Sequence, residues 1–283
     1  MKDGTPTVRF LYGTAAGRGI LRMIMRTHAD RLAVRFLRSS MSRPFVGWFA
    51  GRHGIALPSD HNYHSFQAFF CRKLPRDGLD ITPDHLISPC DGYLSAVPIS
   101  EDNRFLIKGT YYSLWDLLRN SEIARRFSGG VCLIIRLEAR DYHRYCCLDD
   151  GYIGKQHLLD GELHSVQSAA CQRVRVYSRN RRAWNTYQTD HFGQIVQIEV
   201  GALIVGGIVN HYENHRVLKG EEMGYFDLAG STIVLLFQQD RIELLQEIEA
   251  ALARGEEVRV SYGEMIGRSA VPQTAPSNWV TLK

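Results

Sequence analysis

The chain lacks the long apolar segments that membrane-spanning and secreted proteins carry. No stretch of about 18 uncharged apolar residues occurs in its 283 residues, so we expect no transmembrane helix. The N-terminus also lacks the uninterrupted apolar core of a secretory signal. Internal repeats, low-complexity tracts and nucleic-acid-binding motifs are missing too. With 45% hydrophobic and 23% charged residues, the composition is that of an ordinary globular protein of one or two domains.

Cysteine is scarce and shows no metal-binding spacing. None of the cysteines forms a Cys-x-x-Cys pair, and the adjacent Cys146 and Cys147 are a poor pattern for zinc. Free thiols in a reducing cytosol are the simplest interpretation, and we expect no metal ion. The six cysteines are Cys71, Cys90, Cys132, Cys146, Cys147 and Cys171.

Positive charge is unevenly placed along the chain. The net charge of the whole chain is only +4, but residues 1–57 hold ten basic residues against two acidic ones, a net charge of +8. Residues 58–283 therefore carry a net charge of −4. Because this larger part is acidic and no nucleic-acid motif is present, we do not expect nucleic acid as a partner.

The basic N-terminal part predicts an amphipathic helix. Arg18, Arg22 and Arg26 line one side of an apolar stripe, and Arg31 and Arg38 fall on the other side. Such a helix is typical of proteins that bind an anionic membrane surface, so we expect a peripheral membrane protein on the cytoplasmic face. A helix packed on the core with solvated arginines fits the same pattern. The apolar residues of the stripe, within Gly17–Ser40, are Leu21, Ile24, Met25, Leu32 and Phe36.

From about residue 86 onward the pattern changes to short apolar or alternating runs separated by Gly and Asp, which is typical of β-strands. The predicted strands are Tyr93–Val97, Val131–Leu137, Ile195–Val200, Leu203–Val209 and Thr232–Phe237. The other predicted elements are helices at Leu114–Phe127 and Ile242–Arg254 and a loop or edge at Arg173–Arg182. The expected fold class is α+β. A β-rich core of short, mostly antiparallel strands at residues 58–283 follows a helical, basic region at residues 1–57.

The residues Ala229-Gly230-Ser231-Thr232 precede an apolar run and are open to two interpretations. Gly, Ser and Thr often begin a strand, because Gly relieves backbone crowding and the hydroxyls satisfy local backbone groups. The second interpretation is self-cleavage, in which the hydroxyl of Ser231 attacks the carbonyl of Gly230. The ester that results eliminates, and residue 231 is left as a pyruvoyl group. Gly230 suits this reaction because no Cβ obstructs a close approach, but the hydroxyl needs a base to activate it.

Four further segments carry side chains suited to catalysis, although each is common when taken alone. The turn Ser-Pro-Cys-Asp-Gly presents the carboxylate of Asp91. The residues Asp-Tyr-His-Arg at 141–144 place an acid, an imidazole and a guanidinium after a predicted strand. The segments 161–167, which contains His164, and 220–224 are weaker signals.

Taken together and in this order, the segments resemble the phosphatidylserine decarboxylase family, whose members use a self-made pyruvoyl group. The matches that carry the resemblance are residues 69–78 leading to 88–92, residues 141–144 followed by 149–151, and residues 219–226 running into 230–232. Residues 192–193, 199–206 and 263–267 look like the family as well. The resemblance covers roughly residues 64–268, and the N-terminal region matches the family only in character.

The resemblance implies a role for each matching residue. Ser231 matches the serine that becomes the pyruvoyl group, Asp91 the aspartate that acts with a histidine in self-cleavage, and His143 the histidine assigned to proton transfer during decarboxylation. Many members carry a second histidine three residues after the first, where this chain has Cys146. The self-cleavage base is therefore open among His143, Cys146 and His164.

The resemblance also implies the reaction and the form of the enzyme. Self-cleavage gives a β chain of residues 1–230 and an α chain of residues 231–283, and the pyruvoyl group then forms a Schiff base with the substrate. The expected activity is that of a carboxy-lyase converting phosphatidylserine to phosphatidylethanolamine and CO2 without a metal ion. We expect a homodimer of αβ units. The alternatives are decarboxylation of a soluble amino acid and a noncleaving, lipid-binding protein.

Overall fold

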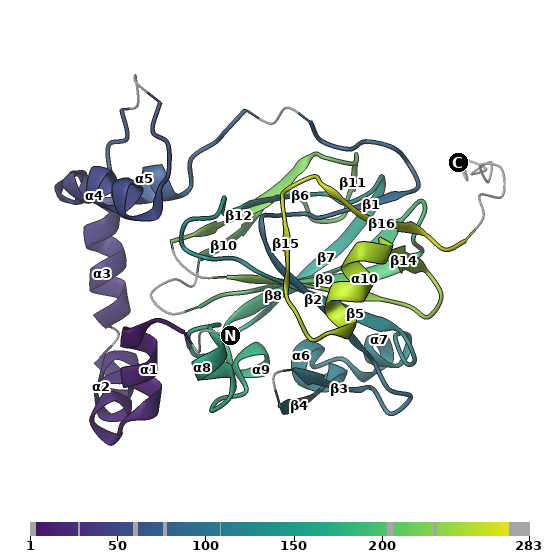
Figure 1. The fold of residues 1–283 in the computed structure, drawn as a ribbon, viewed down its shortest axis with the longest axis horizontal. Helices are drawn as coiled ribbons and strands as arrows, with labels where there is room; N and C mark the ends of the chain where they lie inside the picture. Colours follow the sequence, from purple (N-terminus) through teal and green to yellow (C-terminus); the bar gives the residue numbers. More distant parts are fainter. Residues whose placement is uncertain are drawn as a thin grey trace.

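The fold is that of a computed structural model, which describes residues 4–27, 29–58, 62–75, 78–107, 109–202, 207–228 and 231–271, without the side chains of residues 29–31. The helices of the N-terminal region gather at one side of a body built mainly from β-strands (Figure 1). The predicted α+β class is confirmed, since the strand pairs of the sheets are all antiparallel. Among the described helices, none is long and apolar enough to cross a membrane.

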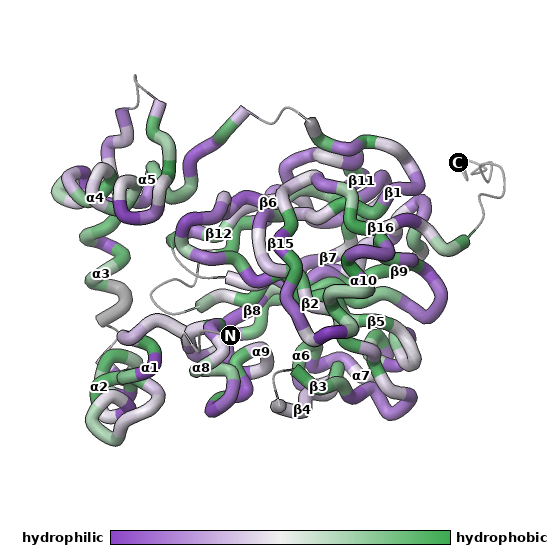
Figure 2. The backbone as a smooth tube through the Cα atoms, viewed as in Figure 1, coloured by the Kyte–Doolittle hydropathy of each residue, from purple (hydrophilic) through white to green (hydrophobic). Residues whose placement is uncertain are grey.

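The N-terminal region is helical, as predicted, but it consists of several short helices. The predicted amphipathic segment is divided between two of them, so its apolar stripe is not continuous: Leu21 is buried, whereas Leu32 is exposed. Hydrophobic stretches run through α1 to α4 (Figure 2). Gly54 ends the last of these four helices in the left-handed conformation, with φ 64°. The helices are α1 (Pro6–Gly13), α2 (Ala15–Thr27), α3 (Ala29–Arg38), the 3-10 turn η1 (Ser40–Ser42), α4 (Pro44–His53) and α5 (Phe66–Phe70).

An eight-stranded antiparallel sheet forms the centre of the body. In spatial order its strands are β11 (His215–Val217), β7 (Gly151–Leu159), β8 (Arg182–Thr189), β9 (Gln194–Val200), β13 (Thr232–Phe237), β5 (Val131–Arg136), β2 (Gly92–Pro98) and β15 (Val258–Val260). Thr232, the first residue of β13, lies opposite Val200 of β9 and Arg136 of β5. The start of β13 is therefore held between two neighbouring strands.

Three smaller sheets and five short helices complete the described part of the chain. The sheets are β1 (His85–Ile87) with β16 (Met265–Ser269) and β14 (Ile242–Leu244), β10 (Gly207–Asn210) with β12 (Glu222–Asp227) and β6 (Arg144–Cys146), and the hairpin of β3 (Arg104–Ile107) and β4 (Thr110–Ser113). The helices are α6 (Leu114–Leu118), α7 (Ser121–Arg125), α8 (Ser168–Cys171), α9 (Val176–Arg179) and α10 (Gln246–Ala253).

Strand β13 lies between the two halves of the hydrophobic core, and every one of its residues is buried. Ile233 and Leu235 belong to the half that includes residues of β1 and β6. Val234 and Leu236 belong to the half that includes residues of α1 and α6. Successive side chains of a strand point to opposite faces, so an all-apolar strand fits between two apolar layers. A central position of this kind fixes β13 by packing on both faces and by hydrogen bonds on both edges.

Several predicted elements differ in their bounds. The helix predicted at 114–127 is two helices, because Arg119 adopts φ 53° and Asn120 caps the second helix. The helix predicted at 242–254 begins only at Gln246, because its first residues pair with β16 as strand β14. Within the predicted strand at 203–209, residues 207–209 belong to β10, and residues 203–206 lie outside the described residues.

The stretch predicted as a loop or edge at 173–182 contains helix α9 and the first residue of β8. Arg182 is buried there, and its guanidinium donates hydrogen bonds to the backbone carbonyls of Leu117, Ser178 and Asn180. A buried arginine is stable only when its N–H groups are satisfied in this way. A charged residue such as Arg182 is not expected in a buried strand, so the sequence pattern did not predict its place in the central sheet.

Candidate active site

Ser231 lies directly before β13 and is fully buried. Its carbonyl accepts a hydrogen bond of 2.9 Å from the amide of Leu137, the residue after β5. Its hydroxyl has no hydrogen-bond partner among the described residues. A buried polar atom without a partner is costly and uncommon, and such atoms often serve in chemistry. Gly230 lies outside the described residues, so the peptide bond between the two residues is not described.

Asp91 holds two other segments next to its own turn. Its carboxylate accepts hydrogen bonds from the amide of Tyr142 at 3.2 Å and from the amide of Tyr262 at 2.9 Å. Tyr142 precedes His143, so the carboxylate lies one residue away from the predicted catalytic histidine. The structure therefore brings Asp91 and His143 into the same neighbourhood.

His143 is a buried, neutral imidazole with a free acceptor nitrogen. Its Nδ1 donates a hydrogen bond of 2.8 Å to the carbonyl of Asp141, and its Nε2 has no partner among the described residues. The ring lies against Phe70, with 4.0 Å between ring centroids. Burial lowers the pKa of His143 to about 4. Near neutral pH, Nε2 thus carries a lone pair that can accept a proton.

Backbone pairing places the predicted catalytic groups at one end of the central sheet. Arg136, the last residue of β5, lies opposite both Tyr93 of β2 and Thr232 of β13. Asp91 and Ser231 stand just before these two strands, and the chain that leaves β5 leads to His143. Three segments that are distant in sequence therefore meet where β2 and β13 begin and β5 ends.

Cys146, which occupies the position of the second family histidine, lies in β6 and is fully buried in an apolar layer. Its amide donates a hydrogen bond of 2.9 Å to the carbonyl of Pro89, in the turn that carries Asp91. The structure thus places Cys146 beside that turn, with its side chain among apolar residues. Apolar surroundings disfavour the thiolate, which is the basic form of a cysteine.

His164 is engaged in a different network. The hydroxyl of Tyr12 in α1 accepts a hydrogen bond from the amide of Ser165 and contacts Nδ1 of His164 at 3.1 Å. Nε2 of His164 contacts the carboxylate of Glu162. Both ring nitrogens therefore have partners, and within the described ranges neither partner is Asp91, His143 or Ser231.

A pocket of about 860 Å³ opens at this end of the central sheet, a volume that suits a small-molecule site. Residues 136–140, which follow from β5, form one wall, and Ala202, just after β9, lies on another. β13 runs between β5 and β9, but Ser231, Asp91 and His143 are not among the residues that line the pocket. Its other lining residues are Gly4, Thr5, Pro6, Val8, Arg9, His53 and residues 165–168.

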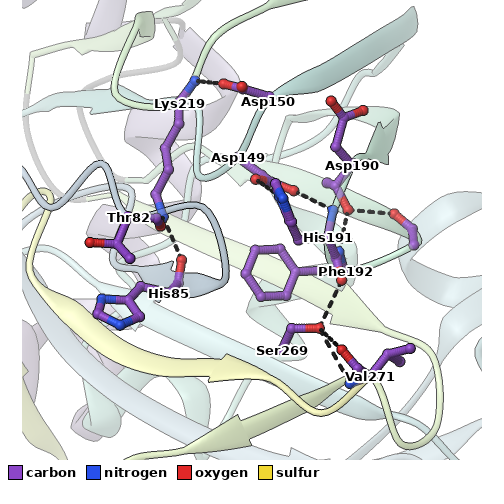
Figure 3. A network of polar contacts seen from close by, with 12 residues as sticks. Thr82, His85, Asp149, Asp150, Asp190, His191, Phe192, Lys219, Ser269 and Val271 are labelled. Carbon is purple, nitrogen blue, oxygen red and sulfur yellow. Dashed lines mark hydrogen bonds and ion pairs between the residues drawn. The ribbon is translucent and has the colours of Figure 1, made fainter. Parts of the chain in front are cut away.

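The motif residues that follow β6 form a polar clamp on another part of the body (Figure 3). The buried carboxylate of Asp149 accepts hydrogen bonds of 2.8 Å from the amide and from Nδ1 of His191. Burial raises the pKa of Asp149. The hydroxyl of Ser269 donates to the carbonyl of His191, and the amide of Lys219 donates to Asp150. These contacts join β16, in the α chain expected from cleavage, to the remainder of the body.

Sequence patterns contain no signal for the residues that orient the site. Leu137, Tyr142 and Tyr262 act through backbone amides, and any residue type except proline supplies such a group. Phe70 is part of a segment that matched the family, but its contact with His143 depends on the tertiary structure. In the described ranges, no group of three or more His, Cys, Asp and Glu side chains is arranged to hold a metal ion.

Comparison with known proteins identifies relatives over most of the chain. A family model described as phosphatidylserine decarboxylase matches residues 66–268. The chain is 36% identical over 268 residues to phosphatidylserine decarboxylase proenzyme 2 of Clostridium acetobutylicum, covering 93% of this chain and 91% of the relative. Over 274 residues it is 35% identical to the phosphatidylserine decarboxylase proenzymes of Desulfitobacterium hafniense and Clostridium botulinum. These two alignments cover 93% of this chain and 92% and 93% of the relatives, respectively.

Proposed function

This chain belongs to the phosphatidylserine decarboxylase family, and on that premise we propose that it is a self-cleaving carboxy-lyase that converts phosphatidylserine to phosphatidylethanolamine and CO2. One observation carries the proposal for this chain: the hydroxyl of Ser231 is buried and unpartnered at the end of the sheet where Asp91 and His143 meet. This is the arrangement that a nucleophilic serine with a nearby base requires.

Self-cleavage uses the groups of the chain itself and one water molecule. Nε2 of His143 accepts the proton of the Ser231 hydroxyl, the oxygen attacks the carbonyl carbon of Gly230, and the peptide C–N bond breaks as its nitrogen takes up a proton. A base then removes the Cα proton of residue 231, and the C–O bond breaks to release Gly230 as a carboxylate. The dehydroalanine that remains tautomerises, and water hydrolyses it to the pyruvoyl group and ammonia.

His143 is the base that the structure favours for these proton transfers. Its Nε2 is unpartnered, whereas both ring nitrogens of His164 have partners and the Cys146 thiol lies in an apolar layer. We assign Asp91 a positioning role, because its carboxylate holds the amide of Tyr142 next to the imidazole. One histidine then serves both self-cleavage and decarboxylation.

The residues at the start of β13 fit a pyruvoyl group. The carbonyl of residue 231 is held by the Leu137 amide and remains in place after cleavage. The hydroxyl oxygen of Ser231 has no hydrogen-bond partner among the described residues, so its loss breaks no hydrogen bond. The pyruvoyl carbonyl supplies an electron sink for the departure of CO2. Nε2 of His143 can take a proton from the ammonium group of the substrate and then deliver it to the substrate carbon, a transfer worth about 10² to 10⁴ in rate.

Cleavage leaves the two chains associated because the α chain begins with the central strand. Thr232 to Phe237 are hydrogen-bonded to strands of the β chain on both edges and are buried on both faces. The clamp around Asp149 holds β16, near the other end of the α chain. Removing the α chain would expose the whole core, which is unfavourable at about 25 cal/mol for each Å² of apolar surface.

The pocket at this end of the central sheet suits a phospholipid headgroup. Arg136 is paired with Glu257 and Glu138, and Arg140 with Glu138. Arg9 also lines the pocket and is exposed, and its side chain has no hydrogen-bond or ion-pair partner in the described part of the chain. We propose that the guanidinium of Arg9 binds the phosphate of the substrate, a group that a soluble amino acid lacks.

Residues 1–57 form the membrane-associating region in this proposal, and residues 58–283 the catalytic core. Large apolar side chains are exposed on α1 to α4, beside the exposed Arg18, Arg22 and Arg26. This combination suits the cytoplasmic face of an anionic membrane. The exposed apolar residues are Phe10, Ile20, Met23, Leu32, Phe36, Met41, Phe45 and Trp48.

An intact mass spectrum of the denatured protein tests the proposal. We expect two chains, with the smaller one starting as a pyruvoyl-blocked residue 231. A single full-length chain would favour a noncleaving lipid-binding protein. Activity on phosphatidylserine vesicles separates the lipid from a soluble amino acid as substrate, and sedimentation of the cleaved enzyme tests the homodimer of αβ units that we also propose.

A further inference from the structure

The segment that precedes the proposed cleavage bond is tethered to the N-terminal helices. Asp227 ends β12, and only 7% of its side chain is exposed. Its carboxylate forms an ion pair with Arg38, the last residue of α3, and accepts a hydrogen bond of 3.6 Å from the thiol of Cys71. Burial raises the pKa of Cys71 to about 12, so the thiol keeps its proton and remains a donor. The buried carboxylate is thus held by groups from outside its own sheet.

The next residue, Leu228, has a backbone conformation that side chains other than glycine seldom adopt. Its φ is 66°, in the left-handed region, where Cβ crowds the backbone. The side chain is nonetheless buried and packs with Phe70 and Cys71. Tertiary packing therefore holds Leu228 in a strained conformation two residues before Gly230.

The chain on the other side of the proposed bond is fixed as well. The amide of Leu137 holds the carbonyl of Ser231 at 2.9 Å, and Thr232 is paired with strands on both sides. Only residues 228–230 lie between Asp227 and Ser231, the two residues that these contacts hold in place. The described residues on both sides of the proposed bond are therefore held in place by contacts with other segments.

We propose that Arg38, Asp227 and Leu228 are positioning residues for self-cleavage. They hold the segment before the proposed bond so that the hydroxyl of Ser231 meets the carbonyl carbon of Gly230. This inference rests on the proposed function, and the bonds formed and broken are those given above. Restricting the conformations of two groups that must react raises the rate of an intramolecular attack. Cutting the chain also releases the backbone strain at Leu228, which favours the cleaved state.

Through Arg38, the N-terminal helices contribute to self-cleavage as well as to membrane binding. Arg38 supplies no group to the chemistry, and its effect passes through Asp227. A role of this kind differs from membrane binding, because it acts on the uncut precursor in the absence of lipid. It also ends when the chain is cut, since the chain between Asp227 and Ser231 is then broken.

The first test follows the cutting of precursor made in a cell-free system, by intact mass over time and without lipid. We expect Arg38→Gln to be cut about tenfold more slowly than the wild type, and Arg38→Lys to recover part of the rate. Arg35→Gln is the matched control, because Arg35 lies on the same helix and is exposed, and its side chain has no partner in the described part of the chain. The control should be cut at the wild-type rate.

A second measurement separates positioning from general damage to the fold. The cut fraction of Arg38→Gln should turn over phosphatidylserine, in detergent micelles, at the wild-type rate per pyruvoyl group. A turnover reduced in parallel with the cutting rate would overturn the positioning role. Cutting of Arg38→Gln at the wild-type rate would also overturn it. A wild-type precursor that is never cut would instead overturn the proposed function.

Leu228 is tested with two variants that differ in the strain they keep. Leu228→Ala removes most of the side chain but keeps a Cβ in the left-handed conformation, whereas Leu228→Gly removes the strain as well. We expect the Ala variant to be cut several times faster than the Gly variant. Equal cutting rates, with both variants folded by circular dichroism, would rule out a contribution of backbone strain.

Discussion

The amide of Tyr142 donates a hydrogen bond of 3.2 Å to the carboxylate of Asp91. This bond fixes the loop that carries His143 to the turn before β2. The amide of Tyr262 fixes the same turn to the segment that follows β15. A carboxylate that accepts two backbone amides acts as a rigid joint between three segments. The position of the imidazole therefore depends on a carboxylate that holds the backbone of the preceding residue.

Replacing Ser231 with alanine should prevent maturation completely. Alanine has no hydroxyl to attack Gly230, so the protein should remain one full-length chain without decarboxylase activity. Intact mass and CO2 release measure the two effects. Ser261→Ala, at an exposed serine in the same α chain, is the control and should be cut like the wild type. Two chains from Ser231→Ala would show that cleavage occurs elsewhere.

Replacing Asp91 with asparagine should slow cutting by about 100-fold, because a small displacement of the reacting groups costs a factor of this size. An amide has one acceptor oxygen where the carboxylate has two, so one of the two backbone amides loses its partner. The rate is measured on newly made precursor. Asp160→Asn, at a side chain that is 95% exposed, should have no effect. Cutting of Asp91→Asn at the wild-type rate would remove this residue from the mechanism.

His143 should make the folded protein less stable at mildly acidic pH. Its pKa is about 4 in the folded protein and about 6.5 in an unfolded chain, so between these values the unfolded chain binds more protons. Stability is therefore lost as the pH falls from about 6.5 to about 4, by up to about 3 kcal/mol at the lower end.

Denaturant unfolding over this pH range, in the uncut Ser231→Ala background, measures the effect. His143→Gln in the same background should show a flatter dependence on pH. Identical slopes for the two proteins would show that the imidazole is not buried in its neutral form.

Replacing Arg18, Arg22 and Arg26 with glutamate should weaken binding to anionic vesicles. Each basic residue near such a surface contributes about 1 kcal/mol, so losing three should weaken binding by about 100-fold or more. Vesicle sedimentation at low salt measures it. A control with the same change in charge replaces the exposed Arg125, Lys155 and Arg173 with glutamate. Equal binding by both triple variants would rule out the N-terminal helices as the electrostatic anchor.

Replacing Arg9 with glutamine should raise KM for a short-chain phosphatidylserine that is monomeric in water, by about tenfold, with kcat little changed. Arg9 lines the pocket and would contact the phosphate, which takes no part in bond breaking. A monomeric substrate separates this contact from membrane binding. Arg18→Gln, which does not line the pocket, is the control. An unchanged KM for Arg9→Gln would place the phosphate elsewhere.

Much of the central sheet could be predicted from apolar runs in the sequence. β5, β9 and β13 were predicted within about a residue, because β5 and β13 are almost wholly apolar and β9 is rich in Ile and Val. β7 and β8 were not predicted, because polar residues such as Asn185 interrupt them. Asn185 is buried and donates a hydrogen bond to the carbonyl of Gly154 in the neighbouring strand. A local pattern does not reveal a buried polar residue that donates a hydrogen bond to a neighbouring strand.

The sequence by itself determined which chemistry is available: a Gly-Ser bond before an apolar strand, an aspartate in a turn, a histidine after a strand, and a basic N-terminal region. The tertiary structure alone decided how these groups relate. The Asp141 carbonyl sets the tautomer of His143, Leu137 holds Ser231, and the packing of α3 brings Arg38 to Asp227. Each of these contacts joins backbone groups or side chains whose type does not specify a partner. Their pairing follows from the order of strands in the sheet and from the burial of the layers around it.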